Sequence, residues 1–146
     1  MICLDASVVV KWFKKEEEFE DEALTLYKKI RDLEINACTN EWTILEVIRG
    51  LTKSGYSNEK VNETYDVLEE LFSLGLIKKV YVSPTIALAK NIEYELNLYA
   101  ADAVHMATAI VSSSTILVSE DKHLHKKKVK DFAGKFGLEI KKLEEV

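Results

Sequence analysis

The stretch that decides the fold is MICLDASVVVKWF, residues 1–13, in which a short apolar run ends at an acidic residue and a helix-forming run follows. Residues 1–4 have the length and composition of a buried strand, and residues 6–13 are expected to continue as a helix. Further strand candidates along the chain are residues 35–39, 80–83, 115–118 and 138–140. Short apolar strands separated by helices are typical of a parallel sheet with helices on both faces. The sequence therefore predicts an α/β protein with a central parallel sheet of four or five strands.

Helical periodicity fills the segments between these strands. Apolar residues recur at three- and four-residue steps over residues 17–33, which predicts one amphipathic helix. Other helices are expected at residues 40–51, from Ser57 or Asn58 to Gly75, from Pro84 to about Asn97, over Ala100–Val111, and in the Lys-rich stretch after residue 121. No internal repeat or linker interrupts the pattern, so we expect a single domain over residues 1–146.

The composition fits a compact domain and limits its partners. The 146 residues are 47% hydrophobic, with 20 Lys and Arg against 25 Asp and Glu and a net charge of −5. A negative charge argues against binding nucleic acid by bulk attraction, but it allows a nuclease whose acids surround a divalent metal. No apolar run approaches the roughly 20 residues that cross a bilayer, so no membrane partner is expected. Cys3 and Cys38 lie in apolar runs where reduced thiols fit, which predicts a cytoplasmic protein.

Four acidic residues stand where a buried site could form. Asp5 follows the first strand, and Asp121 follows the strand at residues 115–118. Ligands gather beyond the carboxyl ends of parallel strands, so both acids would face one crevice if these strands are neighbours. Glu46 interrupts TILEVI and Asp102 interrupts YAADAVHMATAI, and a carboxylate among apolar neighbours needs a partner. Because the only Lys or Arg near either acid is Arg49, a metal cation is the favoured partner.

Each of the four acids also has a purely structural explanation. Asp5 could cap the first helix, and Asp102 could be an N-cap or first-turn acid. Asp121 could be a turn residue, and Glu46 could lie on a solvated helix face. Taken together, four oxygen ligands without a zinc-like spacing of His or Cys favour Mg²⁺, with Mn²⁺ as a substitute. The chemistry that such a site serves is phosphoryl transfer or phosphodiester hydrolysis.

Four segments, taken in order, resemble the PIN domain and, within it, the VapC-type toxin of type II toxin–antitoxin pairs. They are MICLDASVVVKWF, CTNEWTILEVIRGL, LYAADAVHMATAI and TILVSEDKHL. The resemblance covers essentially the whole chain. It implies a three-layer α/β/α fold and an acidic pocket that binds Mg²⁺ or Mn²⁺ and cleaves RNA. It also implies a cognate antitoxin and a homodimer.

Carried over by position, the resemblance assigns the catalytic and metal-binding residues as Asp5, Glu46, Asp102 and Asp121. Asp5 and Asp102 are expected to be the firmest metal ligands, with the other two orienting water or completing the shell. Ser7 and Ser119 match the small hydroxyl residues that accompany the first and fourth acids. Many relatives have a further Asp two residues after the fourth acid, where this chain has His123. That departure bears on whether a second metal is held.

Basic and histidine residues near the acids are weaker candidates. Possible RNA contacts are Arg49, Lys122, Lys126 and Lys127, with a solvated helix face as the alternative for the lysines. Arg49 could instead pair with Glu46. His105 lies one helical turn beyond Asp102 and could approach the same pocket, but a packed helix residue is the expectation.

The leading hypothesis is a metal-dependent endoribonuclease of the toxin type, which cuts single-stranded or loop RNA with a metal-activated water. One alternative is a PIN-type RNA-processing nuclease without an antitoxin. Another is a non-catalytic PIN-like module that binds RNA or protein. A metal-dependent phosphatase is disfavoured, because Asp5 is followed by Ala6 and Ser7 and not by a second Asp two residues on.

Overall fold

A single parallel sheet organises the structure, a computed structural model that describes residues 1–146. Five strands lie in the order β3-β2-β1-β4-β5, and every neighbouring pair is parallel. Their bounds are β1 (Ile2–Leu4), β2 (Ala37–Asn40), β3 (Ile77–Val80), β4 (Ile116–Val118) and β5 (Glu139–Lys141). The α/β class and the parallel sheet predicted from the alternation of strands and helices are confirmed.

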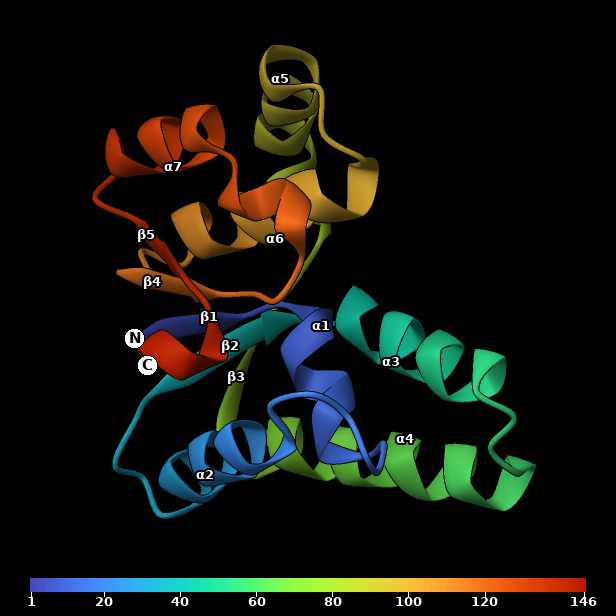
Figure 1. Cartoon of the computed structure of the whole chain (residues 1–146). Helices are drawn as coiled ribbons and strands as arrows, with labels where there is room; N and C mark the ends of the chain where they lie inside the picture. The colour runs from blue at the N-terminus through green and yellow to red at the C-terminus, as the bar shows by residue number, and fades with distance from the viewer.

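Helices cover both faces of the sheet and complete three layers (Figure 1). One face carries α1 (Ala6–Val9), α2 (Glu20–Arg31), α3 (Trp42–Lys53) and α4 (Asn58–Ser73). The other carries α5 (Ile86–Leu96), α6 (Ala100–Val111) and α7 (Lys127–Gly134). Short 3₁₀ turns are η1 (Val10–Trp12), η2 (Ser83–Thr85), η3 (Lys122–His125) and η4 (Leu143–Glu145). No helix is both long and apolar enough to cross a membrane.

Each face of the sheet has its own hydrophobic core, because successive strand side chains point to opposite faces. Leu4 packs into the core beneath α1–α4, whereas Cys3 packs with Met106 and Leu117 into the core beneath α5–α7. Burying one such large side chain contributes roughly 1.5–3 kcal/mol, which holds the short strands in register. Both cysteines are free and buried, as expected from their apolar surroundings.

The order of the strands creates a switch point between β1 and β4. The chain runs from β1 outward through β2 to β3, and then α5 and α6 cross to the opposite face before β4 pairs with the other side of β1. Leu4 is aligned with Val118, so Asp5 and Ser119, the next residue of each strand, lie at the same edge. Such a switch point is where ligands bind in open α/β sheets. β1 and β4 are therefore neighbours, as is required for Asp5 and Asp121 to face one crevice.

The third strand lies earlier in the chain than the apolar pattern predicts. The pattern predicts a strand at residues 80–83, whereas β3 ends at Val80. Gly75, at φ +72°, ends α4, and the strand begins two residues later. Lys78 and Lys79 interrupt the apolar run of this strand and obscured it, while the following Tyr81 is exposed. Pairing with β2, and not local apolarity, sets the position of β3.

Two helices begin or end at other residues than the apolar periodicity predicts, and two others agree with the prediction. The first helix is a four-residue α1 followed by η1, and α2 starts only at Glu20, after Phe19 at φ 58°. Ser57 caps α4 as expected, with its Oγ accepting from the Lys60 N–H at 3.2 Å. The bounds of α6, Ala100–Val111, are those expected.

Candidate active site

Asp5 lies directly after β1, and its carboxylate is tied to the loops around it. The residue is 4% exposed, and its Oδ2 caps α1 by accepting from the Ser7 N–H at 3.2 Å. The same oxygen accepts from the Ser7 hydroxyl and from the Ser119 hydroxyl, the latter at 3.0 Å. The cap considered for Asp5 is therefore present, and the two serines singled out in the sequence both hold this carboxylate.

A buried histidine joins Glu46 to Asp5. His105, on α6, is 1% exposed, and its Nε2 lies 2.5 Å from Glu46 Oε2 and 3.3 Å from Asp5 Oδ1. His105 is packed within the fold, as expected for a helix residue, and its ring also contacts two acids of the site. Its approach to the site agrees with its spacing, since residues three apart share a helix face and His105 follows Asp102 by three. Arg49, the other partner considered for Glu46, is exposed and forms no ion pair.

Opposing influences set the charge of His105. Burial lowers its pKa, but the charge of Asp5 and the hydrogen bond and charge of Glu46 raise it, with a net pKa of about 9. On the other side of the ring, Nδ1 lies 3.4 Å from Asn40 Nδ2. The Thr43 N–H donates to Asn40 Oδ1 at 3.1 Å and so turns the amide nitrogen toward the ring. The Asn40 amide donor disfavours a proton on Nδ1, whereas the carboxylates of Asp5 and Glu46 at Nε2 favour the positively charged ring.

We expect the metal-free protein to lose stability as the pH rises from about 6.5 toward 9. Because the pKa of His105 is about 9 in the folded state and near 6.5 in the unfolded state, its contribution is complete below about pH 6.5 and disappears as the pH rises through 9. Urea denaturation at several pH values measures this loss. His105→Gln has no ring to titrate and should show a flatter profile over this range; identical profiles for the two proteins would contradict the assignment.

Asp102 differs from the other acids because its carboxylate has no partner within the chain. It lies in the first turn of α6, is 6% exposed, and makes no side-chain hydrogen bond or ion pair. Burial, followed by the charges of Asp121 and Asp5, raises its pKa to about 6. A helix N-terminus favours an acid, but here burial and repulsion outweigh that effect. A cation would neutralise such a group.

Asp121 and His123 lie together just beyond β4. Asp121 Oδ1 accepts from the His123 backbone N–H at 2.8 Å and contacts the ring Nδ1 at 2.8 Å. The backbone N–H of Asp121 donates to Ser119 Oγ at 3.0 Å, and the same hydroxyl reaches Asp5. Asp121 therefore has the turn role considered for it, and the turn connects it to Asp5.

The four acids assigned in the sequence line one pocket at the switch point. The lining residues are Asp5, Ala6, Ser7, Glu46, Tyr99, Ala101, Asp102, Asp121 and His123. Ligand atoms of Asp102, Asp121 and His123 lie within 4.8 Å of one another. Clustered carboxylate oxygens, one of them on a buried and unpartnered residue, are a donor set that fits a divalent cation. His123, which stands where many relatives have a further Asp, also lines this pocket, as does Tyr99, which the sequence did not indicate as a site residue.

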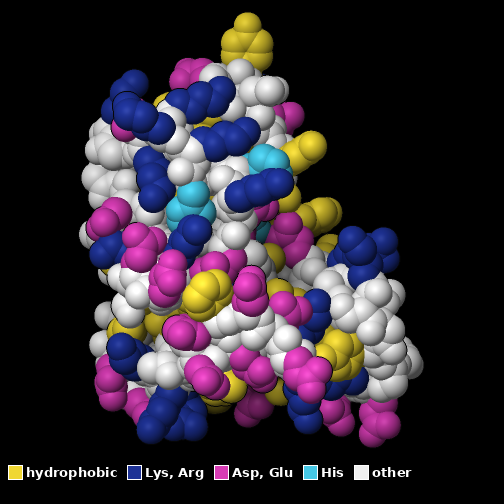
Figure 2. All heavy atoms as spheres, viewed as in Figure 1, with side chains coloured by type: hydrophobic (Ala, Val, Ile, Leu, Met, Phe, Trp, Pro, Cys, Tyr) yellow, Lys and Arg dark blue, Asp and Glu magenta, His cyan; other side chains and the backbone are white.

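The basic candidates for RNA contact lie outside the pocket lining. Lys122, Lys126 and Lys127 are exposed on η3 and at the start of α7, and Lys127 Nζ pairs with Asp131 at 3.0 Å. Figure 2 shows Lys and Arg side chains around the histidines in the upper half of this face, where Figure 1 places α7. Arg49 lies on the other side of the pocket, on α3.

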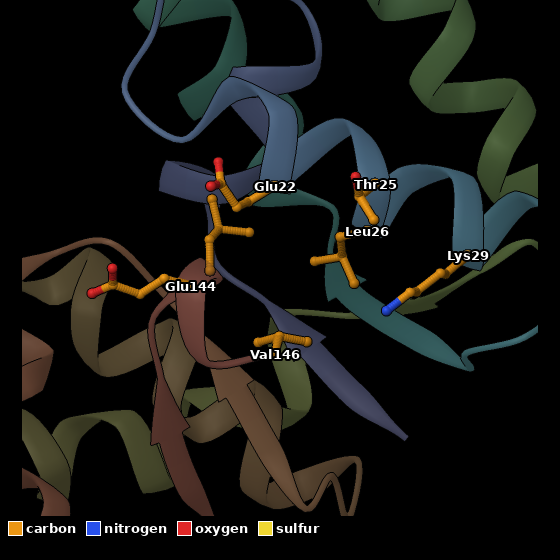
Figure 3. Close-up of a pocket in the computed structure, with 7 residues that line it drawn as sticks. Glu22, Thr25, Leu26, Lys29, Glu144 and Val146 are labelled. Atoms are coloured by element: carbon orange, nitrogen blue, oxygen red, sulfur yellow. The ribbon is translucent and has the colours of Figure 1, made fainter.

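A second pocket lies between α2 and the C-terminal residues (Figure 3). Its lining residues are Glu22, Thr25, Leu26, Lys29, Leu143, Glu144 and Val146. The charged side chains do not converge on one point and form no ion pairs (Figure 3). This pocket has no ligand set comparable to that at the switch point.

The chain is similar in fold to solved toxin–antitoxin proteins over nearly its whole length. The FitAB structure bound to an IR36 DNA fragment has a TM-score of 0.67 and 17% identity, covering 98% of this chain and 95% of that one. DNA-bound VapBC from Salmonella typhimurium has a TM-score of 0.63 and 17% identity, covering 97% of both chains. Mycobacterium tuberculosis VapC20, described as a sarcin–ricin loop cleaving toxin, has a TM-score of 0.63 and 13% identity, covering 84% of this chain and 91% of that one.

At these identities the solved structures establish a shared fold. No curated protein matches the sequence significantly. The family model described as PIN domain matches residues 2–130, a range that contains all four acids of the pocket. From that match and the fold, this chain belongs to the PIN domain family.

Proposed function

We propose that this chain is a divalent-metal-dependent endoribonuclease and the toxin of a type II toxin–antitoxin pair. The observation that carries the proposal is the convergence of Asp5, Glu46, Asp102 and Asp121 on one pocket at the switch point of the sheet. Membership of the PIN family supports a nuclease, and the solved neighbours include a toxin–antitoxin complex from Klebsiella pneumoniae and a sarcin–ricin loop cleaving toxin. Mg²⁺ is the expected cation, with Mn²⁺ as a substitute.

Three aspartates would hold the cation. Asp102 is free of other partners, Asp121 has an oxygen not engaged by His123, and Asp5 adds negative charge beside them. When bound, the cation supplies activation of water and stabilisation of charge on the phosphate. The serine hydroxyls on Asp5 Oδ2 hold that carboxylate in place.

Glu46 would orient the attacking water and accept its proton. Its side chain is 24% exposed, so solvent reaches it, while His105 Nε2 holds Oε2 at 2.5 Å. A general base must be placed within hydrogen-bond reach of the water that it deprotonates. In this arrangement His105 positions Glu46 relative to Asp5.

The surroundings of the pocket support a single-stranded or looped RNA substrate. Tyr99 lines the pocket with 72% of its surface exposed. Unpaired bases stack on such aromatic faces, whereas a base within a duplex cannot. The lysines after Asp121 would contact phosphates as point charges.

The double variant Lys126→Ala/Lys127→Ala is expected to weaken RNA binding and its salt dependence. Each lost phosphate contact should reduce the slope of log K against log[salt] by roughly 0.7 for single-stranded RNA. Binding of a labelled RNA at several salt concentrations in EDTA measures the slope without cleavage. Lys28→Ala/Lys29→Ala on α2 is the matched control and should leave the slope unchanged. Equal slopes in both double variants would exclude the α7 lysines as phosphate contacts.

An antitoxin would bind along α3, beside the pocket. Trp42 and Leu45 are 49% and 54% exposed and, with Glu46 and Arg49, line a shallow surface there. An antitoxin Arg inserted among the acids would compete with the cation, because a carboxylate cluster attracts a guanidinium strongly. Mixing the chain with the product of the neighbouring gene should yield a stable complex and inhibit cleavage. Finding neither complex nor inhibition would favour a PIN nuclease without an antitoxin.

A homodimer is proposed as well, and light scattering of the purified chain measures its mass in solution.

Cleavage of a mixed RNA pool tests the proposed activity. We expect cutting in Mg²⁺ or Mn²⁺, none in EDTA, and recovery when the metal is restored. Glu46→Gln should lower the rate strongly while leaving metal binding largely intact, since Glu46 is assigned to water. Cutting in EDTA would contradict the proposal, and no cutting under any condition by antitoxin-free protein would favour the non-catalytic module.

A further inference from the structure

We infer that His123 is a cation ligand that acts together with Asp102 and Asp121, in a mixed carboxylate–imidazole site that prefers Mn²⁺ to Mg²⁺. The inference deepens the proposed function, since this cation is the one that the proposed nuclease would use. It concerns the position at which this chain has a histidine where an additional aspartate was expected.

The first support is the unused ligand capacity of the two acids. Asp102 is more than nine-tenths buried, lines the pocket, and has no hydrogen-bond or ion-pair partner. Asp121 uses Oδ1 for His123 and leaves Oδ2 without a partner. By contrast, Asp5 Oδ2 accepts from two serines, and His105 lies between Asp5 Oδ1 and Glu46 Oε2. Apart from Glu46 Oε1, the carboxylate oxygens of the pocket that have no partner are therefore those of Asp102 and Oδ2 of Asp121.

The second support is the position of the His123 ring. Asp121 Oδ1 and His123 Nδ1 lie 2.8 Å apart, close to the roughly 3.0 Å that separates adjacent ligands of an octahedral ion. An ion bound between these two atoms would replace the hydrogen bond that joins them, and the ring proton would then be on Nε2. Tyr99 packs edge-on against the same ring, with centroids 5.6 Å apart and an interplanar angle of 89°.

The spacing of the three residues suits one ion. One ligand atom from each lies within 4.8 Å of the others. Opposite ligands of an octahedral ion at about 2.1 Å are about 4.2 Å apart, so side-chain shifts of a few tenths of an ångström suffice. No backbone rearrangement is needed, because Asp121 and His123 are joined by a short turn and Asp102 lies on a well-packed helix.

The chemistry of the third ligand sets the metal preference. Mg²⁺ prefers oxygen ligands and dehydrates reluctantly, whereas first-row transition ions accept imidazole nitrogen readily. A site with an Asp in place of His123 would offer three carboxylates and suit Mg²⁺. With His123 present, we expect Mn²⁺ to bind the metal-free protein at least about tenfold more tightly than Mg²⁺.

Metal binding without RNA tests this preference. Calorimetric titration of the metal-free protein with Mn²⁺ and with Mg²⁺ gives the affinity ratio for wild type and for His123→Asp. The variant should bind Mg²⁺ more tightly and Mn²⁺ less tightly, so that the ratio falls by at least about tenfold. An unchanged ratio, or the absence of Mn²⁺ binding by the wild type, would overturn the inference.

Pulsed electron paramagnetic resonance of bound Mn²⁺ detects the nitrogen ligand directly. Wild type should show ¹⁴N coupling from a coordinated imidazole, and His123→Asp should lose it while still binding Mn²⁺. The chain has three histidines, so His125→Gln is the matched control and should retain the coupling. His125 Nε2 contacts the Ser119 carbonyl oxygen at 2.6 Å, and the residue does not belong to the cluster. Coupling that persists in His123→Asp would assign the ligand to another histidine and reject the inference.

These measurements separate the inference from the proposed function. A protein that binds Mn²⁺ through His123 but cuts no RNA would sustain the inference and refute the nuclease. A protein that cuts RNA with Mg²⁺ and shows neither ¹⁴N coupling nor a preference for Mn²⁺ would refute the inference and sustain the nuclease.

Discussion

Asp5→Asn is expected to reduce metal-dependent RNA cleavage by more than about 100-fold, because even the outer-shell partners of metal ligands cost about 10–100-fold when removed. The substitution removes a negative charge from the pocket but retains a side-chain oxygen. That oxygen can still accept from the Ser7 N–H, and Asn caps helices about as well as Asp. Activity should therefore fall while the fold persists.

Initial cleavage rates and urea denaturation, measured on the same preparations, check both parts of this expectation. Asp66→Asn on α4 is the matched control, since Asp66 is exposed and distant in the fold from the pocket, and it should cleave like the wild type. Full activity in carefully purified Asp5→Asn protein would remove Asp5 from the active site.

Asp102→Asn is expected to stabilise the metal-free protein at pH 7.5 by about 1–2 kcal/mol. Burial and the neighbouring acids raise the pKa of Asp102 to about 6, above its ordinary value of 3.8. Ionisation therefore costs stability above pH 6, and the cost disappears as the pH falls through 6 toward 4. Each unit of pKa shift corresponds to about 1.4 kcal/mol, and contact with solvent at the pocket mouth reduces the full value.

Urea denaturation in EDTA measures this gain, which should shrink at about pH 4.5 where Asp102 is largely protonated in the folded state. Added metal should reverse the order of stability, so that the wild type becomes more stable than Asp102→Asn. At a concentration 100 times its Kd, the ion stabilises the wild type by about 2.7 kcal/mol, whereas Asp102→Asn should gain much less. A variant less stable than wild type in EDTA would show that Asp102 is partnered in solution.

Local sequence information was sufficient for the parts of the fold and site that depend on neighbours in the chain. The strand-end positions of Asp5 and Asp121 follow from short apolar runs, and their meeting follows from the general rule for parallel sheets. The bounds of α6 were predicted because its apolar pattern is nearly continuous and ends at a run of serines after Val111. The third strand was misplaced because its pairing with β2 overrides its weak local pattern.

Long-range contacts were beyond the reach of the sequence. Glu46 and His105 are 59 residues apart, and only the packing of α3 and α6 around the end of the sheet brings them together. The same holds for Asn40, which was expected only to cap a helix but also faces the ring of His105. Tyr99 and His123 come from different loops, and nothing in their local spacing indicates that their rings meet.

The chemistry of the RNA ends tests the central claim most directly. If water activated in the acidic pocket attacks the phosphorus, the products of a single turnover carry linear phosphate and hydroxyl ends, because the RNA 2′-hydroxyl takes no part. We predict such ends in Mg²⁺ or Mn²⁺, with no 2′,3′-cyclic phosphate and no products in EDTA. Cyclic phosphate ends, or the same products in EDTA, would contradict the account.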